Sequence, residues 1–415
     1  MKKRVIFCID IKSFYASVEC IDRGLNPYLY PLVVADKERG QGSIILAVSP
    51  CLRNQGVPSR LRIYELPDRD DIIFATPRMK RYLEISAKIV DLYLDFVAID
   101  DLHIYSVDEC FLDFTHYISF YNKEPYEIAK DIKNKIYEKF GLTVTIGIGE
   151  NMLLSKVAMD IEAKHTEEQI AIWNKEDVKE KLWKITPLSK MWGIGYNLEK
   201  RLNKLGLYSI GDIARYPKKL LVDYFGIIGG QIHDHANGID DSDIREKYIP
   251  KDNSLSLGQV FFKDYKKEEI PLIIREMLDD LSLRLFYHQY VCKTVSLMIG
   301  YSKEEKGGFS RSISLENYSD DIDLIYQAFL QIFNKYCLNK PIRRISLSLQ
   351  QLKKVTYYQL NLLEDPLEQE RKRKLSFTLA KIKEKYGDDA VFRSSSKLEH
   401  STLKQRHSLI GGHKK

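Results

Sequence analysis

Acidic residues occur inside two segments that otherwise have the composition of buried β-strands. Residues 4–10 read RVIFCID and end on Asp10, and residues 102–114 read LHIYSVDECFLDF, with Asp108 and Glu109 in the middle. A carboxylate is costly to bury unless it is paired or binds a metal. Because neighbouring strand residues point to opposite faces, Asp108 and Glu109 can share one site only at a bend of a hairpin. The fold must therefore give these acids a partner.

If Asp10 lies opposite Asp108 and Glu109, three carboxylates converge. Hard oxygen ligands of this kind suit Mg²⁺, which takes the rest of its shell from water and substrate phosphates. Two such ions about 3.5–4 Å apart would contact the attacking and leaving oxygens of a displacement at phosphorus. Each acid taken singly is explained as well by a strand-end cap or a salt bridge. Asp113 has no companion acid, so we expect a structural role for it.

The remaining segments predict an α+β multidomain chain, although strands interleaved with helices over roughly the first 170 residues would also fit an α/β core. Its 415 residues are 44% apolar and 29% charged, which is typical of a folded protein, and at about 100–200 residues per domain they predict two to four domains. A strand is expected over 43–48, and apolar residues recur at helical spacing over 126–140. A second set of strands and helices occupies 257–352, after a polar linker-like segment at 248–256.

Composition also excludes several classes of protein. No apolar run reaches the ~18–20 residues of a membrane span, and Asp10 ends the N-terminal apolar run short of a signal peptide. The six cysteines are scattered without a CxxC pair, so we expect a reduced, cytoplasmic chain without a zinc or disulfide framework. The segment 371–415 holds 13 Lys and Arg against 4 Asp and Glu. We expect this basic tail to have little fixed structure and either to contact a polyanion or to stay solvated.

Three motifs together resemble the Y-family translesion DNA polymerases, most closely the UmuC-like branch of Gram-positive bacteria and mobile elements. They read DIKSFYASVE at 10–19, SVDECFLD at 106–113, and TIGIGEN at 145–151 running into LSKVA at 154–158 and AK at 163–164. They occur in the family's order and spacing, and the resemblance extends over about 1–363.

The resemblance implies a right-hand polymerase. Its expected divisions are a palm at 1–19 and 76–170, small fingers at 20–75, a helix-hairpin-helix thumb at 171–245, a linker at 246–256, a little-finger domain at 257–356, and a clamp-binding peptide with the basic tail at 357–415. Small fingers would leave the nascent base pair loosely enclosed, which favours tolerance of damaged template bases and low fidelity.

The resemblance also implies roles for residues of the first two motifs. Asp10, Asp108 and Glu109 would bind two Mg²⁺ ions, with the backbone carbonyl of Ile11 as a further ligand. Tyr15 matches the family's steric gate, an aromatic ring that would clash with a 2′-hydroxyl and so favours deoxynucleotides. Its neighbour Phe14 is expected to be an ordinary core aromatic.

Two cationic side chains would meet the incoming triphosphate. Arg53 matches the arginine that clamps the phosphates, and Lys164 matches the lysine that reaches the nucleotide. Many relatives carry a Tyr where this chain has Pro50 and a Pro where it has His165. The phosphate contact of that Tyr is then lost or passes to another group, for which the Ser49 hydroxyl is our candidate.

The thumb would hold DNA through a glycine hairpin. Gly193 and Gly195, in MWGIG, would let backbone N–H groups approach a phosphate without reading sequence. The segment GIIGG at 226–230 resembles a second, weaker copy. We expect His233 and His235 beyond it to be polar surface residues and not zinc ligands.

Two further contacts follow from the resemblance. In the little finger, Arg343 and Arg344, with Lys353 and Lys354, are the expected DNA-contacting residues. The segment QLNLL at 359–363 resembles the peptide by which bacterial polymerases dock on the β sliding clamp. Its expected anchors are Gln359, Leu360, Leu362 and Leu363, the last in place of the usual aromatic.

The resulting hypothesis is a DNA-directed DNA polymerase for translesion synthesis in DNA repair and the SOS response. It would use primer–template DNA and deoxynucleoside triphosphates, with the sliding clamp and an accessory subunit or recombinase as partners and without a proofreading exonuclease. The alternatives are a catalytically weak DNA- and clamp-binding protein at stalled forks, and a nucleotidyl cyclase. The intact set of three acids opposes the first alternative, and the thumb-like hairpin and clamp-like peptide oppose the second.

Overall fold

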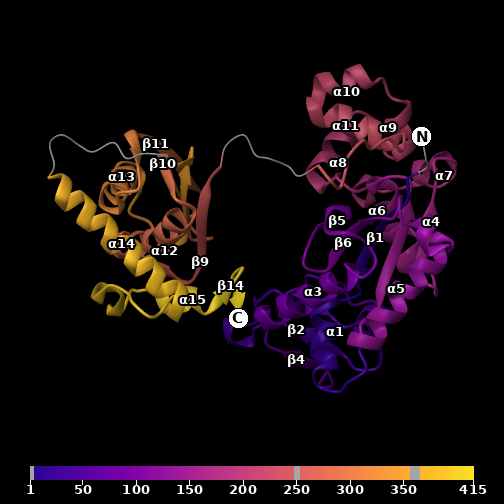
Figure 1. Cartoon of the computed structure of the whole chain (residues 1–415), viewed down its shortest axis with the longest axis horizontal. Helices are drawn as coiled ribbons and strands as arrows, with labels where there is room; N and C mark the ends of the chain where they lie inside the picture. Colours follow the sequence, from indigo (N-terminus) through magenta and orange to yellow (C-terminus); the bar gives the residue numbers. More distant parts are fainter. Residues whose placement is uncertain (1–3, 247–252, 356–364) are drawn as a thin grey trace. The chain divides into compact units, whose positions relative to one another are not determined.

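The computed structural model describes residues 4–246, 253–355 and 365–415, which form two compact units (Figure 1). Unit 1 is Met1–Tyr248 and unit 2 is Ile249–Lys415. Each unit has its own sheets and its own apolar core, so the predicted α+β class is confirmed. Within the described ranges, no helix has both the length and the apolar character that crossing a membrane requires.

Unit 1 is built around a five-stranded sheet with the order β5-β6-β1-β7-β8. Its strands are β1 (Ile6–Ile11), β5 (Leu102–Ile104), β6 (Glu109–Asp113), β7 (Val144–Gly149) and β8 (Ile170–Trp173). β1 lies at the centre, antiparallel to both β6 and β7, which explains why almost all of its residues are apolar. The predicted hairpin over 102–114 is confirmed as β5 and β6, joined by a turn at 105–108.

The helices of this part of unit 1 are α1 (Phe14–Ile21), α3 (Met79–Tyr93), α4 (Ile118–Tyr121), α5 (Pro125–Phe140) and α6 (Met152–Ile161), followed by the short 3₁₀ helix η4 (Ala163–His165). Of these, α5 packs on β7 and β8, and α6 packs on β1, β7 and β8. The predicted helix over 126–140 is confirmed as α5. Helix α6 approaches β7 so closely that a Cβ at Gly147 would lie 2.0 Å from the carbonyl oxygen of Ser155. The glycines of TIGIG therefore let α6 lie over the ends of β1 and β7.

Residues 32–75 form a small separate sheet with the order β3-β2-β4. Its elements are β2 (Leu32–Val34), η1 (Lys37–Arg39), β3 (Ala47–Val48), α2 (Pro50–Asn54), η2 (Ile63–Glu65) and β4 (Ile73–Ala75). The strand expected over 43–48 is shorter than predicted, because Ile44 forms only an isolated bridge with Arg62. A core of its own holds this sheet together.

Unit 1 ends in short helices separated by glycines. They are α7 (Asp177–Glu180), η5 (Leu182–Lys184), η6 (Leu188–Lys190), α8 (Tyr196–Asn203), α9 (Ile210–Arg215), α10 (Lys218–Phe225) and α11 (Ile227–Ala236). Apolar residues from these helices share one core with α6. That core joins the helical segment to the five-stranded sheet.

Unit 2 contains an antiparallel sheet whose four long strands have the order β11-β10-β12-β9, and the short strand β13 also pairs with β10. Its elements are β9 (Leu255–Tyr265), η7 (Lys267–Glu269), α12 (Ile270–His288), β10 (Tyr290–Tyr301), β11 (Gly308–Ser319), α13 (Ile322–Tyr336), β12 (Ile342–Gln350) and β13 (Lys353–Lys354). The linker predicted to reach residue 256 is too long, because Leu255 and Ser256 already pair with β12. A sequence pattern could not separate these residues from a linker, since their neighbours are polar.

The basic C-terminal segment is folded, and the prediction of little fixed structure was wrong. It forms α14 (Pro366–Tyr386), η8 (Ser394–Lys397), α15 (Leu403–His407) and the hairpin β14 (Leu409–Ile410) and β15 (His413–Lys414). Acids of α12 receive its basic side chains. Arg393 binds Asp279 at 2.8 Å, and Arg406 and His407 bind Asp280 at 2.8 and 3.0 Å. Acidic residues of the same chain therefore neutralise part of the positive charge of the C-terminal segment.

We expect Arg406→Ala to loosen this packing. Arg406 also lies 3.9 Å from Glu276, so its loss leaves two largely buried carboxylates short of a cation, at a cost of about 3 kcal/mol. Hydrogen–deuterium exchange of α12 and α15 would measure the loss as faster exchange. Lys374→Ala, which removes an exposed ion pair with Glu370, is the matched control and should change little.

Candidate active site

Asp10 and Glu109 lie side by side at the ends of two neighbouring strands. They are register partners of β1 and β6, and opposed residues of antiparallel strands project from the same face. Asp108 lies in the turn before β6, where its carbonyl accepts a hydrogen bond from the Ile11 amide at 2.9 Å. The turn is the bend that lets both neighbouring acids approach Asp10.

Each of the three carboxylates has one oxygen engaged by the protein. Lys164 Nζ lies 3.5 Å from Oδ2 of Asp10, Lys156 Nζ lies 2.8 Å from Oε1 of Glu109, and Ser106 Oγ donates to Oδ1 of Asp108 at 2.7 Å. The other oxygen of each carboxylate accepts no hydrogen bond from the residues that the structure describes. Three hard donors are thus available at one end of the sheet.

The carboxylates do not by themselves form a closed metal cage. Among the described residues, no three His, Cys, Asp or Glu side chains are grouped closely enough to hold a metal ion. Two ammonium groups supply the local positive charge instead. Burial raises the pKa of Asp10 to about 7 although Lys164 lowers it, and the charges of Asp108 and Glu109 add to the rise. A divalent cation would relieve this repulsion, so the donor set fits such an ion.

Glu109 lies against β1 and α6. Only 7% of the residue is exposed, and its Oε1 also lies 3.2 Å from the Cys8 thiol. Burial, followed by the negative charge of Glu109, keeps the pKa of that thiol well above its usual value, so Cys8 is a neutral donor here. Cys8 therefore helps to orient the carboxylate.

Tyr15, on the first turn of α1, lies close to the same strand ends. Its ring stacks on Tyr82 of α3, with the ring centroids 4.4 Å apart and the planes 15° apart. Tyr82 is buried and donates from its hydroxyl to Glu19 at 2.8 Å, and Arg78 holds the same carboxylate. Phe14 is buried, as expected of a core aromatic. A fixed partner thus holds the Tyr15 ring in one orientation.

Arg53 lies on α2 of the small sheet and is exposed, without an ion pair to any described residue. Ser49, at the N-cap of this helix, was our candidate for a phosphate contact, and that candidate was wrong. It is fully buried; its hydroxyl donates to the Tyr30 carbonyl at 3.0 Å and accepts from the Leu32 amide at 3.1 Å. Ser49 therefore shapes the turn that presents Arg53.

Known protein families and individual proteins are similar to this chain. Models of the impB/mucB/samB family match residues 9–160, its HHH motif matches 175–207, and its C-terminal domain matches 252–362. The "Putative UV-damage repair protein UvrX" of Bacillus subtilis (strain 168) is 40% identical over 415 residues, which cover 99% of this chain and 98% of that protein. The chain belongs to the UmuC-like Y-family DNA polymerases.

Other members and one solved structure extend this result. "DNA polymerase IV 2" of Bacillus subtilis (strain 168) is 31% identical over 421 residues, covering all of both chains. A "Y-family DNA polymerase chimera Dbh-Dpo4(243-245)-Dbh" superposes with a TM-score of 0.68 and 20% identity, over 85% of this chain and 100% of that one. The second likeness concerns the fold alone, and it agrees with the predicted polymerase architecture.

The glycine hairpin of this Y-family chain lies in the segment that the HHH motif matches. Gly193 has φ +89°, which only glycine adopts readily, and Gly195 precedes α8 as its N-cap. Ile194 between them is buried in the core, so the hairpin is anchored from inside. A Cβ at Gly195 would meet nothing within 4 Å, and the backbone there is uncovered.

In the second glycine segment, 226–230, Gly226 separates α10 from α11 and the other residues form the first turn of α11. Here packing demands a glycine, because a Cβ at Gly229 would lie 2.0 Å from the Leu221 carbonyl oxygen. His235, which we expected at the surface, is partly buried and stacks on Trp192, with ring centroids 6.5 Å apart. His233 is partly buried as well, so the surface prediction was wrong for both.

The two expected arginines of unit 2 have different surroundings. Arg343 pairs with Asp264 at 3.2 Å, whereas Arg344 is exposed, makes no ion pair with a described residue and lies across Gly300 on the face of the sheet away from the core. Lys353 and Lys354 are exposed on β13, at the edge of β10. The predicted clamp-binding residues Gln359, Leu360, Leu362 and Leu363 lie outside the described residues.

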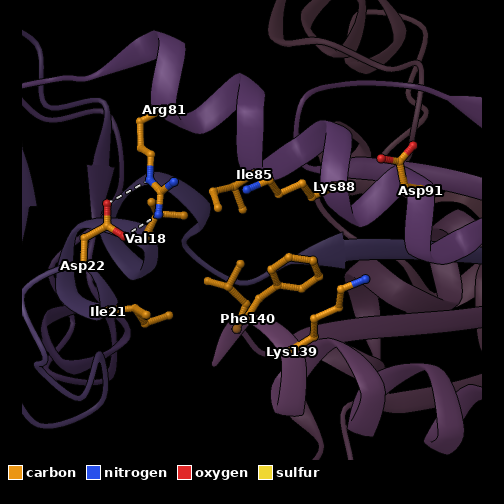
Figure 2. Close-up of a pocket in the computed structure, with 10 residues that line it drawn as sticks. Val18, Ile21, Asp22, Arg81, Ile85, Lys88, Asp91, Lys139 and Phe140 are labelled. Carbon is orange, nitrogen blue, oxygen red and sulfur yellow. Dashed lines mark hydrogen bonds and ion pairs between the residues drawn. The ribbon is translucent and has the colours of Figure 1, made fainter.

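A cavity of about 600 Å³ lies between α1, α3 and α5 (Figure 2). Val18, Ile85 and Phe140 point into it, and at its edge Arg81 donates to Asp22. The ten side chains drawn in Figure 2 include none of the candidate active-site residues. We therefore place the chemistry at the strand ends and not in this cavity.

Lys156 and Asp160, which lie beside the acids together with Lys164, were not predicted from the sequence. Lys156 binds Asp160 at 2.9 Å, and Asp160 binds Lys164 at 2.8 Å. The signal was available, because a basic, an acidic and a basic residue at spacing i, i+4, i+8 interrupt an apolar helical segment. Tyr82 and Glu19 were missed too, and no local pattern links them to Tyr15.

Proposed function

We propose that this chain performs translesion synthesis by two-metal nucleotidyl transfer on primer–template DNA, with low fidelity and without proofreading. The observation that carries the proposal is the meeting of Asp10, Asp108 and Glu109 at one end of β1 and β6, each with a carboxylate oxygen to spare. Family membership supplies the reaction class. The palm, fingers, thumb and little finger would have the divisions inferred from the sequence, with the little finger beginning at β9.

Two Mg²⁺ ions would be held by Asp10, Asp108, Glu109 and the Ile11 carbonyl. When bound, they would lower the pKa of the primer 3′-hydroxyl and neutralise charge on the departing pyrophosphate. The fit of this donor set is supported by the carboxylate oxygen that each acid keeps free of hydrogen bonds from described residues, and by the repulsion from Asp108 and Glu109 that adds to the raised pKa of Asp10.

The remaining side chains would bind and orient the nucleotide. Arg53, exposed and without an ion pair among described residues, would contact the triphosphate as a planar fork. Lys164 would exchange its contact with Asp10 for a phosphate oxygen. Tyr15, fixed by Tyr82, would occupy the space that a ribose 2′-hydroxyl needs.

The protein would bind DNA through the phosphates of the DNA backbone. The uncovered N–H groups of the hairpin at Gly193 and Gly195 suit a phosphate. On unit 2, one row of the sheet consists of four serines, one from each strand. These are Ser256, Ser348, Ser296 and Ser312. Small hydroxyl groups let a duplex approach closely and donate hydrogen bonds without reading sequence.

Arg344→Ala should weaken DNA binding equally for all sequences. If Arg344 contacts one phosphate, its loss reduces the slope of log affinity against log salt by about 1. Fluorescence anisotropy of labelled duplexes over a salt series would measure this slope. Arg343→Ala is the neighbouring control, because Asp264 already neutralises Arg343, and its slope should stay unchanged. Equal effects of both variants would contradict the assignment.

Deleting 359–363 should abolish binding to the β sliding clamp and leave distributive synthesis intact. A short segment with Gln and Leu anchors suits an apolar groove, and no other part of the proposal depends on it. Surface plasmon resonance with a purified bacterial clamp would measure binding. Clamp binding that survives the deletion would show that the peptide lies elsewhere.

Primer extension with Mg²⁺, on an undamaged template and on one with an abasic site, tests the proposal directly. We expect templated extension on the first and insertion opposite the lesion on the second. DNA binding without extension, also after addition of the clamp and a recombinase filament, would favour the catalytically weak DNA-binding protein. Template-independent formation of a cyclic nucleotide would favour the cyclase.

A further inference from the structure

Three charged side chains of alternating sign, Lys156, Asp160 and Lys164, connect Glu109 with Asp10. The path runs from Glu109 to Lys156 at 2.8 Å and on to Asp160 at 2.9 Å. From Asp160 it continues to Lys164 at 2.8 Å and to Asp10 at 3.5 Å. Since Asp10 and Glu109 are register partners, the path closes into a ring over the end of the sheet.

The ring is assembled by a helix that is itself fixed. Lys156 and Asp160 are one turn apart on α6, and Lys164 follows on η4 one further turn along. Gly147 and Gly149 allow α6 to pack close against β7. A Cβ added at these positions would lie 2.0 and 2.4 Å from backbone atoms of Ser155. The lysines thus have little freedom to leave the acids.

Lys156 is the most enclosed cation of the ring. Only 8% of the residue is exposed, and it lies behind Glu109, on the oxygen that the Cys8 thiol also contacts. This arrangement occupies Oε1 and leaves Oε2 for another ligand. Asp160 contacts both lysines, through Oδ2 to Lys156 and Oδ1 to Lys164, and so fixes the distance between them.

We propose that Lys156 and Asp160 are positioning residues of the polymerase reaction. Lys156 holds the Glu109 carboxylate with one oxygen turned outward. Asp160 holds Lys164 over Asp10, where the triphosphate arrives. This inference rests on the proposed function, in which Glu109 is a metal ligand and Lys164 contacts the nucleotide. Neither Lys156 nor Asp160 needs to touch the substrate.

Asp160→Asn tests whether Asp160 positions Lys164. It keeps the shape of a partly exposed side chain and removes the charge that anchors Lys164. We expect KM for the incoming deoxynucleotide to rise about tenfold with a smaller change in kcat, as a misplaced binding group would cause. Lys164→Ala should raise KM likewise. The double variant should be no worse than Lys164→Ala alone, because Asp160 acts through Lys164.

Lys156→Met tests whether Lys156 positions Glu109, with a readout that does not depend on activity. In metal-free buffer the variant should melt at a lower temperature than the wild type, because the buried Glu109 loses its cation. Adding Mg²⁺ should then raise its Tm by more than that of the wild type, since the ion replaces the missing charge. Lys181→Met is the matched control: Lys181 also bridges two carboxylates, Glu162 at 2.9 Å and Asp177 at 3.5 Å, far from the acids along the chain.

The outcomes separate this inference from the proposed function. If Lys164→Ala raises KM and Asp160→Asn does not, positioning by Asp160 is overturned and the nucleotide role of Lys164 stands. If Lys164→Ala leaves KM unchanged, that nucleotide role fails and the Asp160 half fails with it. If Mg²⁺ shifts the Tm of Lys156→Met and Lys181→Met equally, Lys156 is a structural residue only.

Discussion

We expect primer extension to be lost when Asp108 and Glu109 are both replaced by alanine. The double variant removes two of the three acids at the strand ends and takes Glu109 from Lys156, while Asp10 remains beside Lys164. Losing about 4 kcal/mol of transition-state stabilisation corresponds to a rate about a thousand-fold lower. Single-nucleotide extension under single-turnover conditions would measure the fall, with DNA affinity measured beside it.

Asp113→Asn is the matched control for this experiment. Asp113 lies on the same strand, four residues beyond Glu109, and is also buried, but it faces Arg4 at 3.6 Å. Its replacement should lower stability and leave extension nearly unchanged. Extension by the alanine double variant at the wild-type rate would mean that the chemistry takes place elsewhere on the chain.

We expect Tyr15→Ala to raise the incorporation of ribonucleotides relative to deoxynucleotides on the order of 100-fold. Removing the ring removes a clash with the 2′-hydroxyl, and a factor of that size corresponds to about 3 kcal/mol of repulsion. The variant should remain folded, because Tyr82 keeps its hydrogen bond to Glu19 at 2.8 Å. Competition between a ribonucleotide and its deoxynucleotide on one template would measure the ratio.

Tyr15→Phe separates the ring from its hydroxyl. The phenyl ring can still stack on Tyr82 and fill the same space, so discrimination should stay close to that of the wild type. If Tyr15→Ala leaves the ratio unchanged, Tyr15 is not the gate. If Tyr15→Phe loses discrimination as well, the hydroxyl and not the ring excludes the ribose.

Much of the chain could be predicted because its signals are local. The helical spacing over 126–140 gives α5, Gly141 ends it with φ +66°, and the alternation over 102–114 gives the β5–β6 hairpin. The three acids could be named as a group since each interrupts an apolar segment. Family membership followed from motifs in fixed order, which are local as well.

The predictions that failed concern contacts between distant residues. Ser49 looked available for a phosphate, but its hydroxyl binds Tyr30 and Leu32, which only the folded sheet brings to it. The basic tail looked free because its acidic partners lie on α12, more than a hundred residues earlier in the chain. The composition of a segment shows how many charged residues it has, but it does not show which residues neutralise them.

Strand period, helix period and motif spacing are patterns among neighbouring residues, and from them the fold class, the family and the group of three acids could be predicted. The engaged oxygen of each acid and the link through Lys156 and Asp160 became visible only in the folded chain. So did the pairing of Arg343, where Arg344 has no ion pair with a described residue. Strand register and helix packing set distances of a few ångströms between residues far apart in sequence, and no local pattern encodes those distances.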